Sequence, residues 1–260
     1  MTTETSKMLN RRTFIKSAAV AAAGTSALPA FIGNAMAATT KARHHVVIVG
    51  GGYGGATAAK YLRMWGNGAV DVTLIERNTT FVSCPISNLV IGGIKQLEDI
   101  TVSYENLQSK WGVKLITDEA TAIDIDKKTV TTAKHGAIAW DRLVLSPGID
   151  FLPGRIGGLE GNQERIPHAW KAGPQTVLLR KQLEAMPDGG VYARSIPLAP
   201  YRCRPGPYER ACQVAHYCSK AKPRSKVVIF DANDDVTSKG ALFKKAWAER
   251  YKGIIEYRPK

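Results

Sequence analysis

The chain has 260 residues, enough for one large or two ordinary domains, and its 44% hydrophobic and 22% charged residues are typical of a globular protein. Outside the N-terminal region, no apolar run reaches the length of a transmembrane helix, which excludes a protein with several membrane spans. The formal net charge of +14 predicts attraction for anions and acidic partners, but no cluster of basic and aromatic residues indicates nucleic-acid binding.

Residues 1–37 have the pattern of a twin-arginine export signal. Asn10–Lys16 carries two adjacent arginines, Ser17–Gly33 is weakly hydrophobic, and Ala35–Ala37 offers small residues for cleavage. Such signals are addresses for bacterial export. We therefore expect a mature protein that starts near Ala38 and is located in the periplasm. A membrane anchor is the disfavoured alternative because the apolar core is short, and no stable membrane insertion is expected.

A short apolar strand and a glycine turn follow the export signal. His45–Val49 leads into the spacing G-x-G-x-x-G, and a helix is predicted over Ala56–Trp65. In this strand–turn–helix arrangement, the phosphates of a dinucleotide lie at the helix N-terminus, where free N–H groups favour an anion. The predicted cofactor-binding residues of the turn are Gly50, Gly52, Tyr53, Gly54 and Gly55.

A second predicted strand, Val70–Ile75, ends in Glu76, about where an acid meets a ribose hydroxyl in a dinucleotide-binding domain. Arg77 follows and is assigned to the same site. The alternative is a glycine turn in some other α/β unit, with Glu76 merely solvated. Because strand, helix, second strand and acid occur in the required order, nucleotide binding is favoured.

The rest of the first domain is predicted to contain an inserted β-meander. Alternating apolar and polar residues over 121–126 and 128–132 predict paired strands. A buried strand over 141–148 ends in Gly148, which we also assign to cofactor binding because this kind of strand returns under the cofactor in flavoproteins. The other predicted elements are a loop over 95–100, a short helix over 102–111, a strand over 113–117, a turn at 135–136 leading to 138–140, and a linker over 167–173.

A second Rossmann-like unit is predicted to begin with a helix over 174–186 and a strand over 191–196. Its glycine fingerprint should follow that strand, but Pro197–Pro207 contains prolines and Cys203 instead. Proline fixes the backbone and lacks an N–H donor, which argues against NAD(P)H as a substrate. The remaining predicted elements are a helix over 208–220, a strand over 226–230, a helix over 244–251 and a strand over 254–257.

The predicted fold class is an α/β, two-dinucleotide-binding-domain (Rossmann-like) flavoprotein fold of the disulfide-reductase type with an incomplete second domain. The expected divisions are the signal peptide over 1–37, an FAD-binding domain over 38–173 and a partial second domain over 174–260. We expect the chain to be a fragment or a truncated product.

Cys203 is the cysteine with the most informative surroundings. Arg202 and Arg204 flank it, and a helix N-terminus lies four residues further on, which together favour a thiolate. A redox role is therefore favoured over a structural one. For Cys84, which precedes a proline, the residues alone leave a buried structural thiol and a functional thiol equally open. The chain has no C-x-x-C-H motif, so it attaches no c-type haem itself.

The helix after Cys203 carries three further residues of interest. Glu209 lies in its first turn, where helix capping is favoured over proton transfer. Cys212 and His216 are four residues apart and could face one metal ion, but the sequence supplies no further ligands nearby, so no metal site is assigned. Cys212 and Cys218 point to different faces of a helix and do not form an intrahelical disulfide.

Four segments together resemble the flavoprotein subunit of flavocytochrome c sulfide dehydrogenase. They are the glycine turn with Glu76, Ser83–Asn88 with Val90–Gly93, Pro167–Gly173, and Tyr201–Arg210. The resemblance implies that Cys84 carries FAD through a thioether, that Cys203 is one half of a redox-active disulfide beside the flavin, and that Glu209 is an acid near the same site. The family's second disulfide cysteine lies in a C-terminal part that this chain does not contain.

The resemblance implies that hydrosulfide is oxidised in the periplasm and that electrons pass through FAD to a c-type cytochrome subunit. Hydrosulfide would attack the Cys203 disulfide and leave a persulfide and a thiolate. A sulfide:quinone oxidoreductase and an NAD(P)H-dependent flavoprotein are the alternative enzymes. A non-catalytic FAD-binding remnant or docking module is the alternative of another class.

Overall fold

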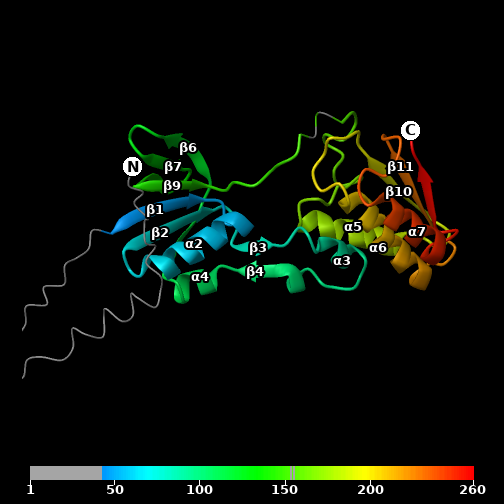
Figure 1. The fold of residues 1–260 in the computed structure, drawn as a ribbon, viewed down its shortest axis with the longest axis horizontal. Helices are drawn as coiled ribbons and strands as arrows, with labels where there is room; N and C mark the ends of the chain where they lie inside the picture. The colour runs from blue at the N-terminus through cyan, green and yellow to red at the C-terminus, as the bar shows by residue number, and fades with distance from the viewer. Residues whose placement is uncertain (1–42, 153, 155) are drawn as a thin grey trace, which may run out of the picture. The chain divides into compact units, whose positions relative to one another are not determined.

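The structure is a computed structural model that describes residues 43–152, 154 and 156–260 (Figure 1). The export signal predicted over 1–37 lies outside the described residues. The described chain contains two parallel sheets, one formed by residues before 146 and the other by residues after 190. Both predicted Rossmann-like units therefore have a sheet, while the domain division at residue 173 stays a prediction.

The first sheet has four parallel strands in the order β5-β2-β1-β9. Their bounds are β1 His44–Val49, β2 Val70–Glu76, β5 Lys114–Thr117 and β9 Arg142–Leu145. The predicted strand over 141–148 is thus shorter than expected. It is also less buried, because β9 lies at the end of the strand order and leaves Leu145 57% exposed.

Alternate residues of β1 supply two cores on opposite faces of the first sheet. Val46 and Ile48 pack with Ala59 of α2 (Tyr53–Gly66), whereas Val47 packs with Val130 of the β-meander. The meander confirms the predicted paired strands. It consists of β6 Ala120–Asp124, β7 Thr129–Thr132 and β8 Gly136–Ala139, all antiparallel.

The segment between β2 and β5 differs from the prediction. Residues 101–103 form β4 (Thr101–Ser103), which pairs with β3 (Thr80–Val82), and only Glu105–Ser109 is helical, as α4. The predicted helix over 102–111 is therefore wrong in its first part, because cross-strand pairing with β3 outweighs the local helical pattern. Two short elements lie between these strands, α3 (Ser87–Ile91) and the 3-10 helix η1 (Glu98–Ile100).

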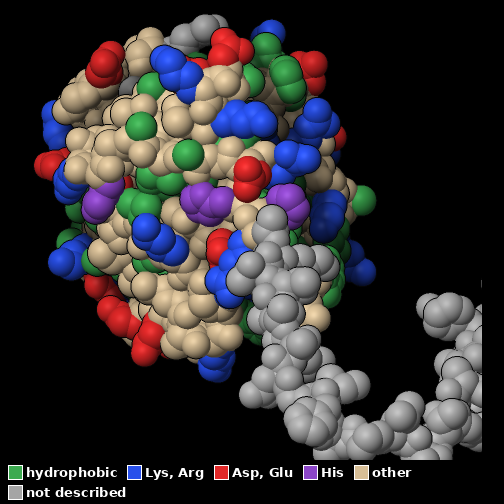
Figure 2. Space-filling view, turned by 90° about the vertical axis from the view of Figure 1, so that its left-hand side faces the viewer, with side chains coloured by type: hydrophobic (Ala, Val, Ile, Leu, Met, Phe, Trp, Pro, Cys, Tyr) green, Lys and Arg blue, Asp and Glu red, His purple; other side chains and the backbone are tan. Residues whose placement is uncertain are grey.

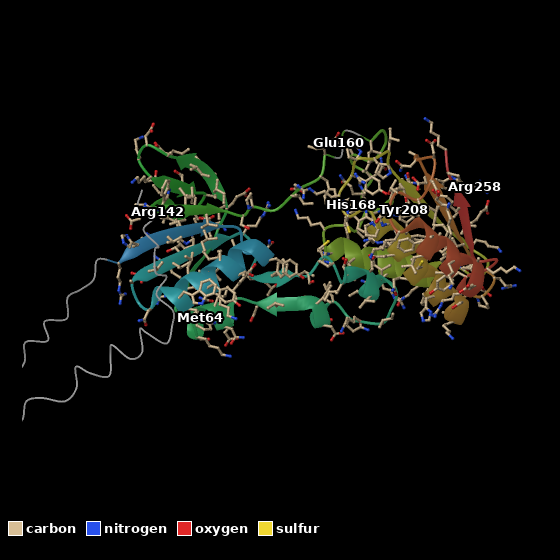
Figure 3. All side chains as sticks on the ribbon, viewed as in Figure 1. Met64, Arg142, Glu160, His168, Tyr208 and Arg258 are labelled. Atoms are coloured by element: carbon tan, nitrogen blue, oxygen red, sulfur yellow. The ribbon has the colours of Figure 1, made fainter. Side chains whose placement is uncertain are left out.

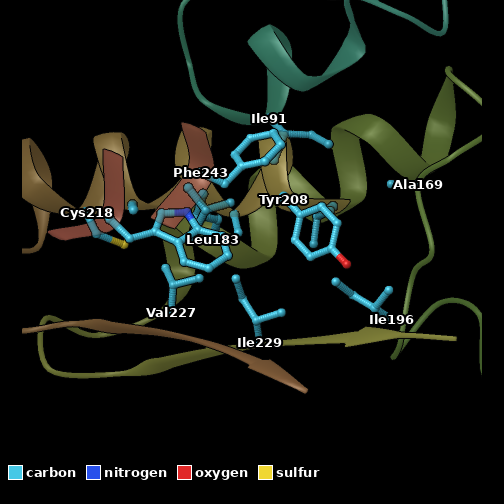
Figure 4. Close-up of a cluster of buried hydrophobic side chains, with 14 residues drawn as sticks. Ile91, Ala169, Leu183, Ile196, Tyr208, Cys218, Val227, Ile229 and Phe243 are labelled. Carbon is cyan, nitrogen blue, oxygen red and sulfur yellow. The ribbon is translucent and has the colours of Figure 1, made fainter. Parts of the chain in front are cut away.

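The second sheet is parallel, in the order β10-β11-β12. Side chains of four helices, α3 and three longer ones, pack with those of the strands in one hydrophobic cluster, in which Tyr208 lies above Ile196 and Ile229 (Figure 4). The elements are α5 Pro174–Ala185, β10 Val191–Ile196, α6 Gly206–Ala221, β11 Lys226–Asp231, α7 Gly240–Arg250 and β12 Ile255–Arg258. In the part of the chain that the structure describes, no helix combines the length and apolar character needed to cross a membrane.

Candidate cofactor and thiol site

Two glycines of the fingerprint are required by packing of the turn itself. Gly50 has φ +98°, and a Cβ there would lie 2.1 Å from the carbonyl oxygen of Ser146. A Cβ on Gly55 would lie 1.8 Å from the carbonyl oxygen of Gly50. No larger side chain fits either position, so these glycines let the first turn of α2 lie against the ends of β1 and β9.

Gly52 differs, because the protein does not fill the space beside it. It is the N-cap of the 14-residue helix α2, and no side chain caps the free N–H groups. A Cβ on Gly52 would meet only the Phe81 ring, at an ordinary 3.8 Å. Free N–H groups at the N-terminus of a long helix, beside an uncrowded glycine, fit the pyrophosphate of a dinucleotide. The first turn of α2 also includes the predicted residues Tyr53 and Gly54.

The predicted ribose acid, Glu76, lies at the end of β2 beside this turn. One carboxylate oxygen accepts a hydrogen bond from the Gly51 N–H (2.7 Å), and the other accepts two from Asn78. The structure therefore brings Glu76 to the glycine turn. Arg77 is exposed beyond it.

Gly148 is not part of the turn. It is exposed and has φ +78°, and a Cβ at this position would have no protein atom within 4 Å. The residue of this segment that does contact the turn is Ser146, next to Gly50 and 2.5 Å from where a Cβ of Gly54 would lie. The sequence pattern points to Gly148 and not to Ser146, because only the tertiary structure reveals that contact.

Cys84 lies between β3 and α3 and is linked to the glycine turn through its neighbour. The hydroxyl groups of Ser83 and Tyr53 are 2.5 Å apart, and Tyr53 packs edge-to-face on Phe81. The Cys84 thiol donates a hydrogen bond to the carbonyl oxygen of Trp170 (2.8 Å). Partial burial raises the pKa of this thiol, an effect that the positive charge of Arg210 opposes.

Cys203 lies in the loop between β10 and α6, with its backbone in the left-handed region (φ +55°). Its Sγ atom is 3.0 Å from where a Cβ of Gly206 would lie, and the Trp170 ring is 3.3 Å from the same point. The carbonyl oxygen of Trp170 therefore bonds to Cys84, while its ring lies near Cys203. Cys203 itself is exposed, as are the flanking Arg202 and Arg204.

The loop that carries Cys203 is held to the end of β11 by two polar side chains. Asn233 accepts a hydrogen bond from the Ala199 N–H (2.9 Å) and donates one to the Pro197 carbonyl (3.0 Å). The hydroxyl group of Tyr201 lies 2.7 Å from that of Thr237. These contacts fix the proline-rich loop where a second dinucleotide fingerprint would otherwise lie.

Asp231, at the end of β11, occupies the position that corresponds to Glu76 in the first sheet. It is 4% exposed and accepts hydrogen bonds from Tyr208, Tyr257 and Asn233. Its carboxylate oxygens are therefore bonded within the protein. Both oxygens of Glu76 are bonded too, but Glu76 is only half-buried, so the burial of Asp231 is what sets it apart and agrees with the inference from the prolines that the second unit does not bind a dinucleotide in the usual way.

Arg210 is the largest fully buried side chain among the described residues, and it connects three segments that are separate in the sequence. Its guanidinium donates hydrogen bonds to Asn88 Oδ1 (2.8 Å), the His168 carbonyl (2.6 Å) and the Ala169 carbonyl (2.7 Å). Its Cζ atom also lies 3.6 Å from the centre of the Trp170 ring. The segment around His168, labelled in Figure 3, is thus part of the site, and, as predicted, residues 167–173 form no helix or strand.

Glu209 and the remaining cysteines are not held at the two thiols by any described contact. Glu209 is exposed on the first turn of α6, and no side-chain hydrogen bond caps that helix, so side-chain capping is not observed. Cys212 accepts a hydrogen bond from the Trp247 indole (3.3 Å), and Cys218 is buried in the core. His216 is exposed. Among the described residues, no group of three or more His, Cys, Asp or Glu side chains is arranged to hold a metal ion.

Comparison with protein families gives two matches that together span most of the described chain. Residues 44–182 match the model of the pyridine nucleotide-disulphide oxidoreductases. Residues 176–260 match the model of the central part of the flavoprotein chain of flavocytochrome c sulfide dehydrogenase.

Individual proteins give the same picture. The flavoprotein chain of the flavocytochrome c sulfide dehydrogenase of Chlorobaculum thiosulfatiphilum is 58% identical over 38 residues, which are 15% of this chain and 77% of that sequence. The sulfide-quinone reductase of Aquifex aeolicus (strain VF5) is 33% identical over 93 residues, which are 36% of this chain and 21% of that protein.

The crystal structure of the sulfide:quinone oxidoreductase from Aquifex aeolicus superposes with a TM-score of 0.69 and 26% identity. The match covers 83% of this chain and 51% of the crystallised one. The present chain thus spans about half the length of that relative. The predicted α/β fold with parallel sheets is confirmed.

Proposed function

The chain belongs to the pyridine nucleotide-disulphide oxidoreductase family and is homologous to the flavoprotein chain of flavocytochrome c sulfide dehydrogenase; on that premise we propose that it takes part in the oxidation of hydrosulfide. The coarser activity, that of an FAD-dependent oxidoreductase, follows from the family. The substrate, the electron acceptor, the periplasmic location and the covalent attachment of FAD are our proposals.

The placement of the two thiols carries the proposal. Cys84 and Cys203 are far apart in the sequence, but Cys84 bonds to the Trp170 carbonyl and Cys203 lies near the Trp170 ring, and Ser83 links the Cys84 segment to the glycine turn. FAD held at Gly52 would have its pyrophosphate at the N-terminus of α2, with Glu76 near its ribose and Cys84 as the attachment point. When bound, FAD supplies the capacity to accept two electrons.

In this arrangement the protein residues have distinct tasks. Cys203 is proposed as the redox thiol, because it is exposed on a loop that Asn233 fixes in place. Trp170 accepts the hydrogen bond of the Cys84 thiol through its carbonyl oxygen. Glu209 remains a candidate acid, supported by its place one helical turn after the loop of Cys203.

Covalent attachment of FAD is tested on the full-length chain precipitated with acid. We expect yellow colour in the pellet, a flavin mass on the Cys84 peptide, and release of all flavin in Cys84→Ser. Colour entirely in the supernatant of the wild-type protein would contradict the thioether but not FAD binding.

Hydrosulfide oxidation is tested by anaerobic addition of hydrosulfide and observation of the visible flavin absorbance. We expect bleaching in the wild-type protein, no bleaching in Cys203→Ser, and normal bleaching in the control Cys218→Ala, whose thiol is buried in the core. Bleaching that persists in Cys203→Ser would exclude that thiol as the site of reaction.

Sulfide:quinone oxidoreduction is a second candidate, favoured by the similarity to the Aquifex aeolicus proteins. The identity of the electron acceptor distinguishes these two candidate functions. Reoxidation by a c-type cytochrome but not by a soluble quinone supports the first proposal, and the reverse result supports the second.

A further inference from the structure

Tyr104 is a buried polar residue to which the proposed function assigns no task. It lies between β4 and α4 and is 4% exposed, and its ring belongs to the core that contains Val46, Ile48 and Ala59. Its hydroxyl group donates a hydrogen bond of 2.9 Å to the carbonyl oxygen of Gly51, which is 53 positions earlier in the chain. A side chain of the core therefore reaches the middle of the glycine turn.

The hydrogen bond to Gly51 also sets the direction of the next backbone donor. The Gly51 carbonyl and the Gly52 N–H belong to one peptide unit, which is planar and trans, so the two groups point in opposite directions. Because Tyr104 holds the carbonyl oxygen on the side of the core, the Gly52 N–H points away from Tyr104. Among the described residues this N–H has no acceptor, and the space beside Gly52 is uncrowded. An oriented donor in this position fits a phosphate oxygen of a ligand.

The preceding peptide unit is fixed by Glu76, whose carboxylate accepts the hydrogen bond of the Gly51 N–H at 2.7 Å. Gly51 therefore has both backbone groups bonded to side chains, one from the end of β2 and one from the segment before α4. These side chains also explain why residue 51 is a glycine, because a Cβ there would lie 2.6 Å from the Tyr104 hydroxyl oxygen and 3.0 Å from Cγ of Glu76. The dinucleotide fingerprint leaves this position free, so the requirement comes from the contacts of this protein.

Tyr104 acts on the turn by geometry and not by charge. Burial raises the pKa of its phenol, and the negative charge of Glu76 raises that pKa further. The phenol is therefore neutral at physiological pH and donates its proton to the Gly51 carbonyl, which can only accept. The orientation of this peptide unit is thus in place before a ligand arrives, and ligand binding carries no cost for ordering it.

From these contacts we propose that Tyr104 is a positioning residue for the cofactor, which holds the peptide unit between Gly51 and Gly52 so that the Gly52 N–H is aimed at the pyrophosphate of FAD. The inference rests on FAD binding at the glycine turn, as in the proposed function, and not on hydrosulfide as the substrate. It predicts a contribution that depends on phosphate. A ligand without phosphate does not use the Gly52 N–H and should bind independently of the Tyr104 hydroxyl group.

The test compares ligands with and without phosphate on the full-length chain. The parent protein carries Cys84→Ser, so that FAD binds reversibly, and it is freed of flavin before its dissociation constants are measured for FAD and ADP by calorimetry and for adenosine by NMR titration. ADP has the pyrophosphate but no flavin, and adenosine has neither. Tyr104→Phe, which keeps the ring, is expected to weaken the binding of FAD and ADP about three- to tenfold, the effect of one hydrogen bond, and to leave adenosine binding unchanged. Tyr257→Phe is the matched control and should change none of the three constants, because it removes a hydroxyl donor to Asp231 (3.1 Å) in the second sheet.

Thermal unfolding shows whether each variant is folded. If the space left by the hydroxyl group unfolds Tyr104→Phe, para-fluorophenylalanine at position 104 fills that space without donating a hydrogen bond and must give the same selective loss. Unchanged affinity for FAD and ADP in the folded variant overturns the inference, and so does an equal loss for adenosine, which would indicate a general effect on the shape of the site. A parent protein that binds neither FAD nor ADP overturns the proposed cofactor site together with this inference, whereas equal affinities overturn the inference alone.

Discussion

Arg194 is a residue at which charge and burial conflict. Its guanidinium is buried next to that of Arg210, and its Nε atom makes no hydrogen bond within the described chain. Natural proteins retain such groups mainly where they serve a site rather than stability. Replacement of Arg194 by an apolar residue should therefore make the fold more stable.

We predict that Arg194→Met increases the free energy of unfolding by about 1 kcal/mol or more, since it removes a buried charge that has no carboxylate partner among the described residues and keeps a similar volume. Urea unfolding measures the change. Arg180→Met is the matched control, because Arg180 also lies over an aromatic ring, at 4.3 Å from Tyr217, but donates to Glu184 and to the Ile91 carbonyl. The control should be less stable than wild type; a loss of stability in both variants contradicts the prediction.

In the turn before α2, Gly55 is required for packing, whereas Gly52 is proposed to be required for cofactor binding. A Cβ on Gly55 would overlap the Gly50 carbonyl, whereas a Cβ on Gly52 would contact only Phe81 at 3.8 Å. We predict that Gly52→Ala folds with wild-type stability but retains much less FAD, because its methyl group occupies the space proposed for the pyrophosphate. Gly55→Ala should lose on the order of 2 kcal/mol or more of stability. Flavin content and thermal unfolding measure both, and full FAD content in Gly52→Ala would place the cofactor elsewhere.

The β-meander depends on a single buried carboxylate. Asp118 accepts hydrogen bonds from the backbone N–H groups of Glu119, Lys134 and His135 and from the His135 ring. Burial acts to raise the pKa of Asp118, but these hydrogen bonds outweigh it and lower the pKa below its ordinary value.

The stabilisation from Asp118 is therefore complete above the ordinary pKa of an aspartate, about 3.9, and is lost as the pH falls through the lower pKa of the folded protein. We predict that wild-type stability falls in this acidic range and that Asp118→Asn, already weaker at neutral pH, shows a flatter dependence. Thermal unfolding between neutral and acidic pH tests this. Parallel curves for the two proteins would show that other carboxylates dominate.

At the scale of the whole molecule, the excess of basic residues, together with the proposed function, predicts a salt-dependent encounter with an acidic electron acceptor. The formal net charge is +14, and on the face shown in Figure 2 lysine and arginine side chains are interspersed with acidic ones rather than gathered in one block. We predict that reduction of an acidic c-type cytochrome slows as ionic strength rises, because screening weakens long-range attraction. The rate of reduction of a neutral quinone analogue, the control, should not change with ionic strength. A rate of cytochrome reduction that is independent of ionic strength would contradict a role of net charge in the encounter.

How much of this molecule the sequence predicts depends on the range of the interactions involved. The glycine turn, Glu76 and the paired strands of the meander are encoded by patterns within a few residues, and the structure contains all of them. No local pattern predicts β4, because its partner β3 lies some twenty residues away. Trp170 and Arg210 lie in two of the segments that carry the family resemblance, but their contacts with each other and with Asn88 are revealed only when three distant segments come together.

The hydrogen bond from Arg210 to Asn88 also constrains the order of biosynthesis. It joins α6 to α3 across 122 positions of the chain, so the ribosome completes the Cys84 segment long before it adds the residue that fixes it. On the proposed function, a nascent chain that ends before α6 can display Cys84 but cannot hold it against Trp170. If FAD is attached at Cys84 as proposed, flavinylation is then a late maturation event that follows synthesis of α6.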